Sequence, residues 1–234
     1  EQTPTELPKP TTSCIAVAGP VHQGSAKLTN LPWEMSETAL SAATGLERLE
    51  LVNDFAVLIH GLSHFSDEQQ VVLQIGLHRS APAPAGAENG PVAILGAGTG
   101  LGMARGLPAA GRWLALPSEG GHREFAPRSE EEWELAQWLK QDLGLQRLSV
   151  ERIVSGTGLG HVMHWLLHRQ TGIQHGLKAQ AQAWRTMSAD QPGYPDLPAL
   201  TSQAAAEGDQ LAGKALKLWL GAYGSAAGDL ALQE

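Results

Sequence analysis

The sequence predicts an α/β protein with a packed core. Short apolar runs of the length of buried strands alternate with longer stretches in which apolar residues recur at every third or fourth position, as on one face of a helix. Of the 234 residues, 42% are hydrophobic and 17% are charged. That composition predicts a folded chain, of one large domain or two small ones, rather than a disordered one.

Strands and one short helix are predicted in the first part of the chain. Residues 13–18 form a short apolar run closed by a Gly-Pro pair, which is typical of a buried strand and a turn. Residues 24–29 predict a second, half-exposed strand. Ser36 is a candidate N-cap for a short helix that ends near Gly45, and residues 49–53 predict a further buried strand.

This last strand ends in an adjacent amide and carboxylate, Asn53 and Asp54, and an apolar, helix-like run follows at residues 55–62. Ligands bind at that edge of open α/β sheets. Asp54 could accept a proton from a substrate hydroxyl or hold a magnesium ion. It could equally be the N-cap of the helix that follows. The residues alone leave these three interpretations open.

A glycine-rich stretch at residues 96–102 follows an apolar run at residues 92–95. Strand-like patterns at residues 101–105 and 112–116 complete a predicted meander of three strands. A weaker strand is predicted earlier, at residues 71–76.

The glycine stretch does not match the known phosphate-binding motifs. The dinucleotide-binding fingerprint requires glycine where Leu101 or Met103 stands, and the chain contains no Gly-Lys-Ser/Thr of a P-loop. What remains is a tight turn that exposes backbone N–H groups and the Thr99 hydroxyl. Such a turn either cradles an anion or forms a hairpin without a ligand.

Two adjacent glycines, flanked by Glu119 and His122, allow the backbone to pass close to a ligand. The carboxylate and the imidazole can each form a directional hydrogen bond with a sugar hydroxyl. A zinc site is disfavoured because His and Glu do not recur at helical spacing here. Glu151, by contrast, is interpreted from its spacing as a solvated charge paired with Arg152.

The second half of the chain is predicted to be mostly helical. Ser129 and Glu132 have the spacing of a capping box. The buried face of the helix they open is predicted to hold Trp133, Ala136, Leu139 and Leu143. Later helices are broken around residues 192–198, and Asp209 is a candidate cap for the last one. Its apolar pattern still runs at residues 230–232, so we expect an interior piece of a longer protein.

The composition also excludes several classes of protein. A formal net charge of −8 argues against a protein whose main work is binding nucleic acid. The single cysteine, Cys14, excludes an internal disulfide and a multi-cysteine zinc site. No apolar run approaches the roughly 20 residues that span a bilayer. We therefore expect a cytoplasmic protein without a membrane partner.

Four motifs stand in the order in which one family carries them: Asn53-Asp54, Gly98-Thr99-Gly100-Leu101-Gly102, Glu119-Gly120-Gly121-His122 and Ser155-Gly156-x-Gly158. With them the chain resembles the bacterial glucokinases of the hexokinase–actin-like superfamily, from about Cys14 to Leu232. The zinc-binding cysteines of a related branch of sugar kinases are absent.

The resemblance implies a two-lobed, actin-like (ribonuclease H-like) sugar kinase fold that is incomplete at both ends. Family members begin with a phosphate-binding loop and carry an adenosine-binding motif near the end, and neither occurs in this sequence. We expect a partial small α/β lobe at residues 1–64 and a partial large α/β lobe at residues 65–234, with a cleft between them.

The resemblance also implies ATP-dependent phosphorylation of D-glucose at the 6-hydroxyl, with ATP and Mg²⁺ as cofactors, and it allows a homodimer. Asp54 would be the catalytic residue that receives the proton of the 6-hydroxyl. The implied sugar-binding residues are Asn53, Glu119, His122 and Glu151, and those facing the ATP phosphates are Gly98, Thr99 and Gly100. The alternative is a non-catalytic glucose sensor of the same fold. The isolated 234 residues are expected to have little or no activity.

Overall fold

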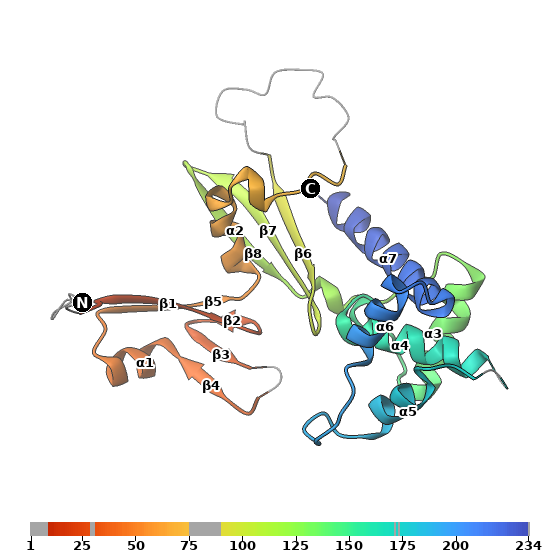
Figure 1. Cartoon of the computed structure of the whole chain (residues 1–234). Coiled ribbons are helices and arrows are strands. Elements are labelled where there is room, and N and C mark those ends of the chain that lie inside the picture. The colour runs from red at the N-terminus through yellow and green to blue at the C-terminus, as the bar shows by residue number, and fades with distance from the viewer. Residues whose placement is uncertain (1–8, 29–30, 75–89, 171, 173, 234) are drawn as a thin grey trace, which may run out of the picture. The chain divides into compact units, whose positions relative to one another are not determined.

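The computed structural model describes residues 9–28, 31–74, 90–170, 172 and 174–233. They form an α/β structure in which strands occupy mainly the first half of the chain and helices the second (Figure 1). The chain divides into two compact units. Unit 1 comprises Glu1–Ile94 and Ala104–Pro117, and unit 2 comprises Leu95–Met103 and Ser118–Glu234.

Unit 1 contains a pair of parallel strands, both predicted. β1 (Thr12–Val17) pairs with β5 (Arg48–Asn53), and the register places Val17 opposite Asn53. Buried and more exposed residues alternate along much of both strands, which is the pattern of a sheet with one covered face. Because parallel strands need a crossover connection, the chain between them leaves the pair and returns.

That crossover consists of a small antiparallel sheet and one helix. The sheet strands are, in order, β2 (Val21–His22), β3 (Ser25–Lys27) and β4 (Glu34–Ser36). Helix α1 (Glu37–Thr44) begins after Ser36 as predicted, although the serine side chain makes no capping hydrogen bond. It ends at Gly45, whose φ of 72° lies in the left-handed region that glycine tolerates.

Short helical segments follow β5. They are α2 (Ala56–Gly61), η1 (Leu62–His64) and η2 (Asp67–Gln69). The weaker strand predicted at residues 71–76 is wrong over its described part, residues 71–74, which has no strand. Val71, Val72 and Leu73 are 82%, 76% and 95% exposed. A short apolar run therefore did not indicate a buried strand here, because periodicity alone carries little information over so few residues.

The predicted three-stranded meander is confirmed. Its strands are, in order, β6 (Val92–Ala97), β7 (Leu101–Ala109) and β8 (Arg112–Ser118). Ala110 and Gly111 join β7 to β8 with positive φ values of 48° and 75°. Two such residues characterise the type I′ turn, whose twist matches an antiparallel hairpin. The three residues between β6 and β7 are likewise too few for a parallel crossover.

The boundaries of the two compact units differ from the predicted boundary between the lobes, at residues 64 and 65. Residues 65–94 and 104–117 belong to unit 1, and residues 95–103 belong to unit 2. Strands β6 and β7 therefore contribute residues to both units. The lobes at residues 1–64 and 65–234 stay a prediction.

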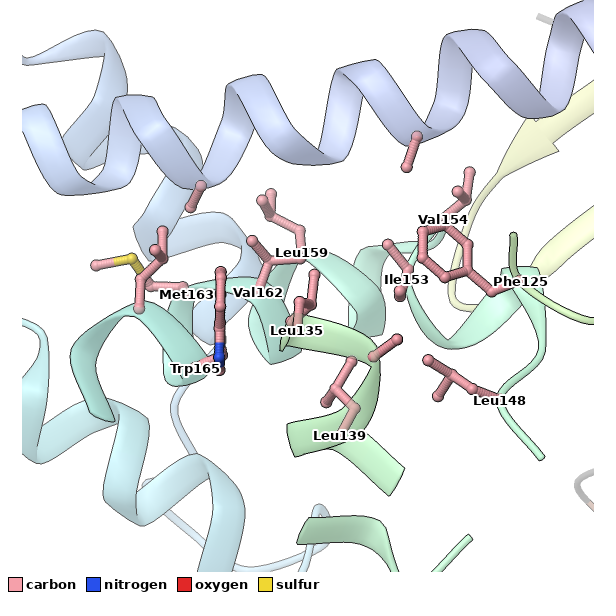
Figure 2. Close-up of a cluster of buried hydrophobic side chains, with 14 of the residues drawn as sticks. Phe125, Leu135, Leu139, Leu148, Ile153, Val154, Leu159, Val162, Met163 and Trp165 are labelled. Atoms are coloured by element: carbon pink, nitrogen blue, oxygen red, sulfur yellow. The ribbon is translucent and has the colours of Figure 1, made fainter. Parts of the chain in front are cut away.

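Unit 2 is built mainly of helices around one apolar core. Its elements are η3 (Gly120–His122), α3 (Glu130–Leu143), η4 (Val150–Arg152), α4 (Gly156–Arg169), α5 (Lys178–Thr186), α6 (Leu197–Ala206) and α7 (Gln210–Ala231). Helix α4 packs against α3, α5, α6 and α7. Figure 2 shows the core side chains where α3, α4 and the segment before α4 meet, among them Leu139, Leu148 and Val162.

The buried face of α3 differs in part from the predicted one. Ala136 and Leu139 are buried as predicted, and Leu143 is partly buried against the core. Trp133, however, is 55% exposed, and Leu135 is buried instead. The true stripe is therefore shifted by about half a turn at its N-terminal end.

Only half of the predicted capping box is present. The Ser129 hydroxyl accepts a hydrogen bond from the Glu132 N–H at 3.2 Å, as a cap should. The Glu132 carboxylate accepts from the Arg128 N–H at 2.7 Å and pairs with the Arg128 guanidinium, not with the backbone of Ser129. The buried Glu132 thus forms an ion pair with the residue before the cap. None of the helices in the described part of the chain is long and apolar enough to cross a membrane.

Candidate functional site

The end of β5 gives Asn53 a structural role. Its Oδ1 accepts hydrogen bonds from the N–H groups of Phe55 at 3.1 Å and Ala56 at 3.0 Å. Its Nδ2 donates to the Gly19 carbonyl at 3.2 Å. The capping function that the sequence left open for Asp54 therefore falls largely to its neighbour.

Asp54 is half-buried, and its side chain forms fewer hydrogen bonds than that of Asn53. Its Oδ1 accepts from the Phe55 N–H at 3.0 Å and from Asn53 Nδ2 at 3.2 Å. Within the described residues, Oδ2 has no hydrogen-bond partner. A carboxylate with one oxygen oriented by the protein and the other uncommitted is suited to accept a proton or to bind a cation.

A cavity of about 690 Å³ in unit 1 lies against β5, α2 and β8. Most of its lining is apolar, and the polar or charged lining residues are Glu50, Asn53, His60, Arg112 and Trp113. The Asn53 amide already bonds to backbone groups through both its oxygen and its nitrogen.

The turn between β6 and β7 rests on the start of α4. The Gly98 carbonyl accepts a hydrogen bond from the Gly156 N–H at 2.7 Å, and the Thr99 carbonyl accepts one from the Thr157 hydroxyl at 3.2 Å. In a trans peptide the N–H points opposite to the carbonyl before it. The N–H groups of Thr99 and Gly100 therefore point away from α4, where they can cradle an anion.

Segment η3 presents Glu119 and His122 together. His122 Nε2 lies 3.6 Å from Glu119 Oε2, and the two side chains are 53% and 57% exposed. The backbone beneath them is fixed, because the His122 N–H donates to the Glu119 carbonyl at 3.0 Å and Arg147 Nη1 donates to the His122 carbonyl at 2.7 Å. Two polar side chains on a fixed backbone, both open to solvent, suit a small polyhydroxylated ligand.

Glu151 contacts the turn between β6 and β7, residues 98–100, which we call the glycine turn. Its Oε2 accepts a hydrogen bond from the Leu101 N–H at 3.0 Å. A Cβ at Gly100 would lie 2.5 Å from the same oxygen, so only glycine fits there without displacing the carboxylate. Within the described residues no ion pair joins Glu151 to Arg152, and the interpretation of Glu151 as a solvated, paired charge is wrong.

Leu101, the first residue of β7, is where three of these segments meet in unit 2. Its N–H bonds to Glu151, and its carbonyl would lie 2.4 Å from a Cβ at Gly121. The absence of a side chain at Gly121 thus lets η3 approach β7 closely. The Val150 N–H donates to the Arg123 carbonyl at 2.9 Å, which joins the chain after η3 to η4.

Glu119, His122 and Glu151, the predicted sugar-binding residues of unit 2, therefore lie on adjoining segments. These segments lie beside the turn that carries Thr99. Asn53 and Asp54 belong to unit 1. That they share a cavity with the residues of unit 2 stays a prediction.

Sequence reasoning assigned no role to Thr157 or Arg147, which support the glycine turn and the His122 backbone. A hydroxyl in the first turn of a helix is a weak signal for Thr157, since such residues usually bond locally. Arg147 carries no signal in the sequence, because its partner is a backbone carbonyl 25 residues away.

Known proteins resemble the chain over most of its length. The family model described as Glucokinase matches residues 2–234. Glucokinases of Synechocystis sp. and Trichormus variabilis are 41% and 37% identical to it over 94% and 96% of the chain. The same alignments cover 61% and 64% of those relatives, so the chain spans about three fifths of their length.

Solved structures agree. The glucokinase from an Antarctic psychrotroph has a TM-score of 0.67 at 29% identity, over 94% of this chain and 60% of that one. The glucokinase from Balamuthia mandrillaris, solved in complex with glucose, has a TM-score of 0.68 at 20% identity, over 94% of this chain and 60% of that one, a likeness of fold alone. The predicted actin-like sugar kinase fold is confirmed. The chain belongs to the glucokinase family.

Proposed function

We propose that the protein transfers the γ-phosphoryl group of ATP to the 6-hydroxyl of D-glucose. Two observations support this: membership of the glucokinase family, and the meeting of the η3, η4 and glycine-turn segments at Leu101. The proposal concerns the whole protein, since the chain spans about three fifths of its relatives' length. Its one exposed, free cysteine, Cys14, fits a reducing cytoplasm as the place of action.

In this proposal Glu119, His122 and Glu151 bind hydroxyls of the sugar, together with Asn53. Carboxylates accept hydrogen bonds from hydroxyls and an imidazole can accept or donate. A site built of such groups rejects sugars that lack a hydroxyl, because the protein group would be left without a partner. The Asn53 amide already forms three hydrogen bonds with the backbone and one with Asp54 Oδ1, so a contact with a sugar hydroxyl would replace the bond from Nδ2 to Asp54.

The N–H groups of Thr99 and Gly100 would face the phosphates of ATP. Their direction, away from α4, supports that role. Magnesium held with a nucleotide ordinarily takes one or two carboxylates besides the phosphate oxygens. Among the described residues no three His, Cys, Asp or Glu side chains are grouped as a cage that could hold the ion by themselves. When bound, the metal would neutralise phosphate charge.

Asp54 would act on the attacking hydroxyl. The 6-oxygen of glucose forms a bond to the γ-phosphorus, the bond from the γ-phosphorus to the β,γ-bridging oxygen breaks, and ADP leaves. The proton of the hydroxyl passes to the Asp54 carboxylate. Phosphoryl transfer depends mainly on positioning and charge neutralisation, and the fixed Oδ1 of Asp54 supports the positioning.

Glucose-dependent formation of ADP tests the proposal. With ATP as donor we expect turnover on D-glucose, binding without phosphorylation of D-xylose, which lacks the 6-hydroxymethyl group, and rates lower by orders of magnitude on sugars that lack a ring hydroxyl. Inorganic polyphosphate in place of ATP distinguishes the donor. Glucose binding without phosphoryl transfer from either donor would contradict the proposal and favour a glucose sensor.

A further inference from the structure

The carboxylate of Glu151 supports one end of the glycine turn. It bonds to the Leu101 N–H at 3.0 Å and fills the space that a side chain at Gly100 would take. A hydrogen bond from a backbone N–H to an ionised carboxylate is roughly twice as strong as one between neutral groups. Losing it would leave the C-terminal end of the turn without that support.

The other end of the turn is held by α4, through Gly156 and Thr157. The two supports are connected, because the Ser155 hydroxyl donates to the Glu151 carbonyl at 2.7 Å. The turn is therefore held from both ends by one continuous stretch of chain, residues 151–157. A displacement of the Glu151 side chain acts directly on the backbone groups that follow Thr99.

We propose that Glu151 is a positioning residue for the nucleotide phosphates as well as a ligand of the sugar. The inference rests on the proposed function. An ionised carboxylate can accept about four hydrogen bonds. Among the described residues, the Leu101 N–H supplies one of them to Glu151. A sugar hydroxyl bound to the same carboxylate restricts its rotamers to those that reach Leu101. The turn is then ordered before the nucleotide arrives, which makes the two ligands bind cooperatively.

The test measures the affinity of a non-hydrolysable ATP analogue, AMPPNP with Mg²⁺, by calorimetry without glucose and at saturating glucose. We expect glucose to tighten AMPPNP binding about fivefold or more, and AMPPNP to tighten glucose binding by the same factor. Glu151→Ala should reduce this coupling factor to about one. His122→Ala is the matched control: it weakens glucose binding but keeps the wild-type coupling once the sugar is saturating.

Gly100→Ala tests the same contact while keeping the Glu151 side chain. Its Cβ would lie 2.5 Å from Glu151 Oε2 and displace the carboxylate from the turn, so coupling should again fall to about one. This variant decides the matter if Glu151→Ala shows no cooperative thermal transition. Coupling that persists in either folded variant overturns the inference, as does equal loss in His122→Ala.

The failure of the inference is distinguishable from failure of the proposed function. A wild-type protein that phosphorylates glucose but binds the two ligands independently contradicts only the role of Glu151. A wild-type protein that binds no glucose contradicts both.

Discussion

Asn53 Oδ1 accepts a hydrogen bond from the Ala56 N–H at 3.0 Å, so the amide rather than the adjacent carboxylate completes the start of α2. The same amide group, through Nδ2, binds the Gly19 carbonyl at 3.2 Å and ties the end of β5 to the turn after β1. The effects of substituting the two residues should therefore differ. Asn53 should matter to stability, and Asp54 to chemistry.

Asn53→Asp should lower the free energy of unfolding by about 1–3 kcal/mol. The new carboxylate oxygen would replace Nδ2 and face both the Gly19 carbonyl and the Asp54 carboxylate. A capping role alone predicts no change, because Asp caps helices as well as Asn does. Urea denaturation measures the difference. Asp54→Asn keeps an acceptor for Phe55 and serves as the control, within about 0.5 kcal/mol of the wild type. Equal stability of the two variants would show that the bond to Gly19 contributes little.

Asp54→Asn should reduce kcat by at least about 100-fold and leave glucose affinity nearly unchanged. The amide keeps the shape of the side chain but cannot take the proton of the 6-hydroxyl. A coupled assay of ADP formation gives kcat, and calorimetry gives the Kd of glucose. Asp67→Asn, on η2, is a control for the loss of one carboxylate in the same unit. If turnover survives in Asp54→Asn, the base is another group.

The elements that the sequence predicted well are those with local causes. The strand that ends at Asn53 and the last helix, which begins after the Asp209 cap, are read from apolar spacing and from residues within four positions of their ends. The meander was predicted because β-strand patterns and glycines follow one another along the chain. Such signals do not depend on partners far away in the sequence.

The contacts that the sequence could not predict depend on distant partners. The spacing of Glu151 indicated a solvated charge, because the N–H group that donates to its carboxylate belongs to Leu101, 50 residues earlier in the sequence. Trp133 has the apolar character of a core residue, yet it is Leu135 that is buried in the core between α3 and its neighbours. Which side of a helix is covered is decided by its neighbours, so an apolar residue at the margin of the stripe can lie on either side.

Two helical glycines should respond to alanine in opposite directions. A Cβ at Gly158, in α4, would lie 2.0 Å from the Ile153 carbonyl oxygen, which is backbone and cannot rotate aside. Gly158→Ala should therefore cost about 1–3 kcal/mol of unfolding free energy. Gly213 in α7 has no atom within 4 Å of such a Cβ, and Gly213→Ala should stabilise by up to about 1 kcal/mol through helix propensity. Denaturant unfolding of both variants makes the comparison, and a Gly158→Ala protein as stable as Gly213→Ala would contradict the packing at the start of α4.

Two histidines of α4 should make the protein less stable in mild acid. His161 is buried and its ring donates to the Arg152 carbonyl at 2.9 Å, while Nδ1 of His164 is buried without a hydrogen-bond partner in the described part of the chain. Burial lowers the pKa of both rings below the usual 6.5, and for His161 the hydrogen bond to the Arg152 carbonyl offsets part of that lowering. Nearby Arg185 lowers the two pKa values further, and Asp142 raises them.

Because the folded rings resist protonation, the unfolded chain binds more protons below about pH 6.5, and the free energy of unfolding falls as the pH decreases through that value. The slope is at most about 1.4 kcal/mol per pH unit for each histidine. Urea unfolding between about pH 8 and about pH 5.5 measures it, above the range near pH 4 where carboxyl groups ordinarily titrate. His164→Phe keeps an aromatic ring edge against Trp138, whose centroid lies 5.3 Å away, and removes one titrating group. The slope should be shallower in this variant, and an unchanged slope would show that His164 is already protonated in the folded protein or equally accessible in both states.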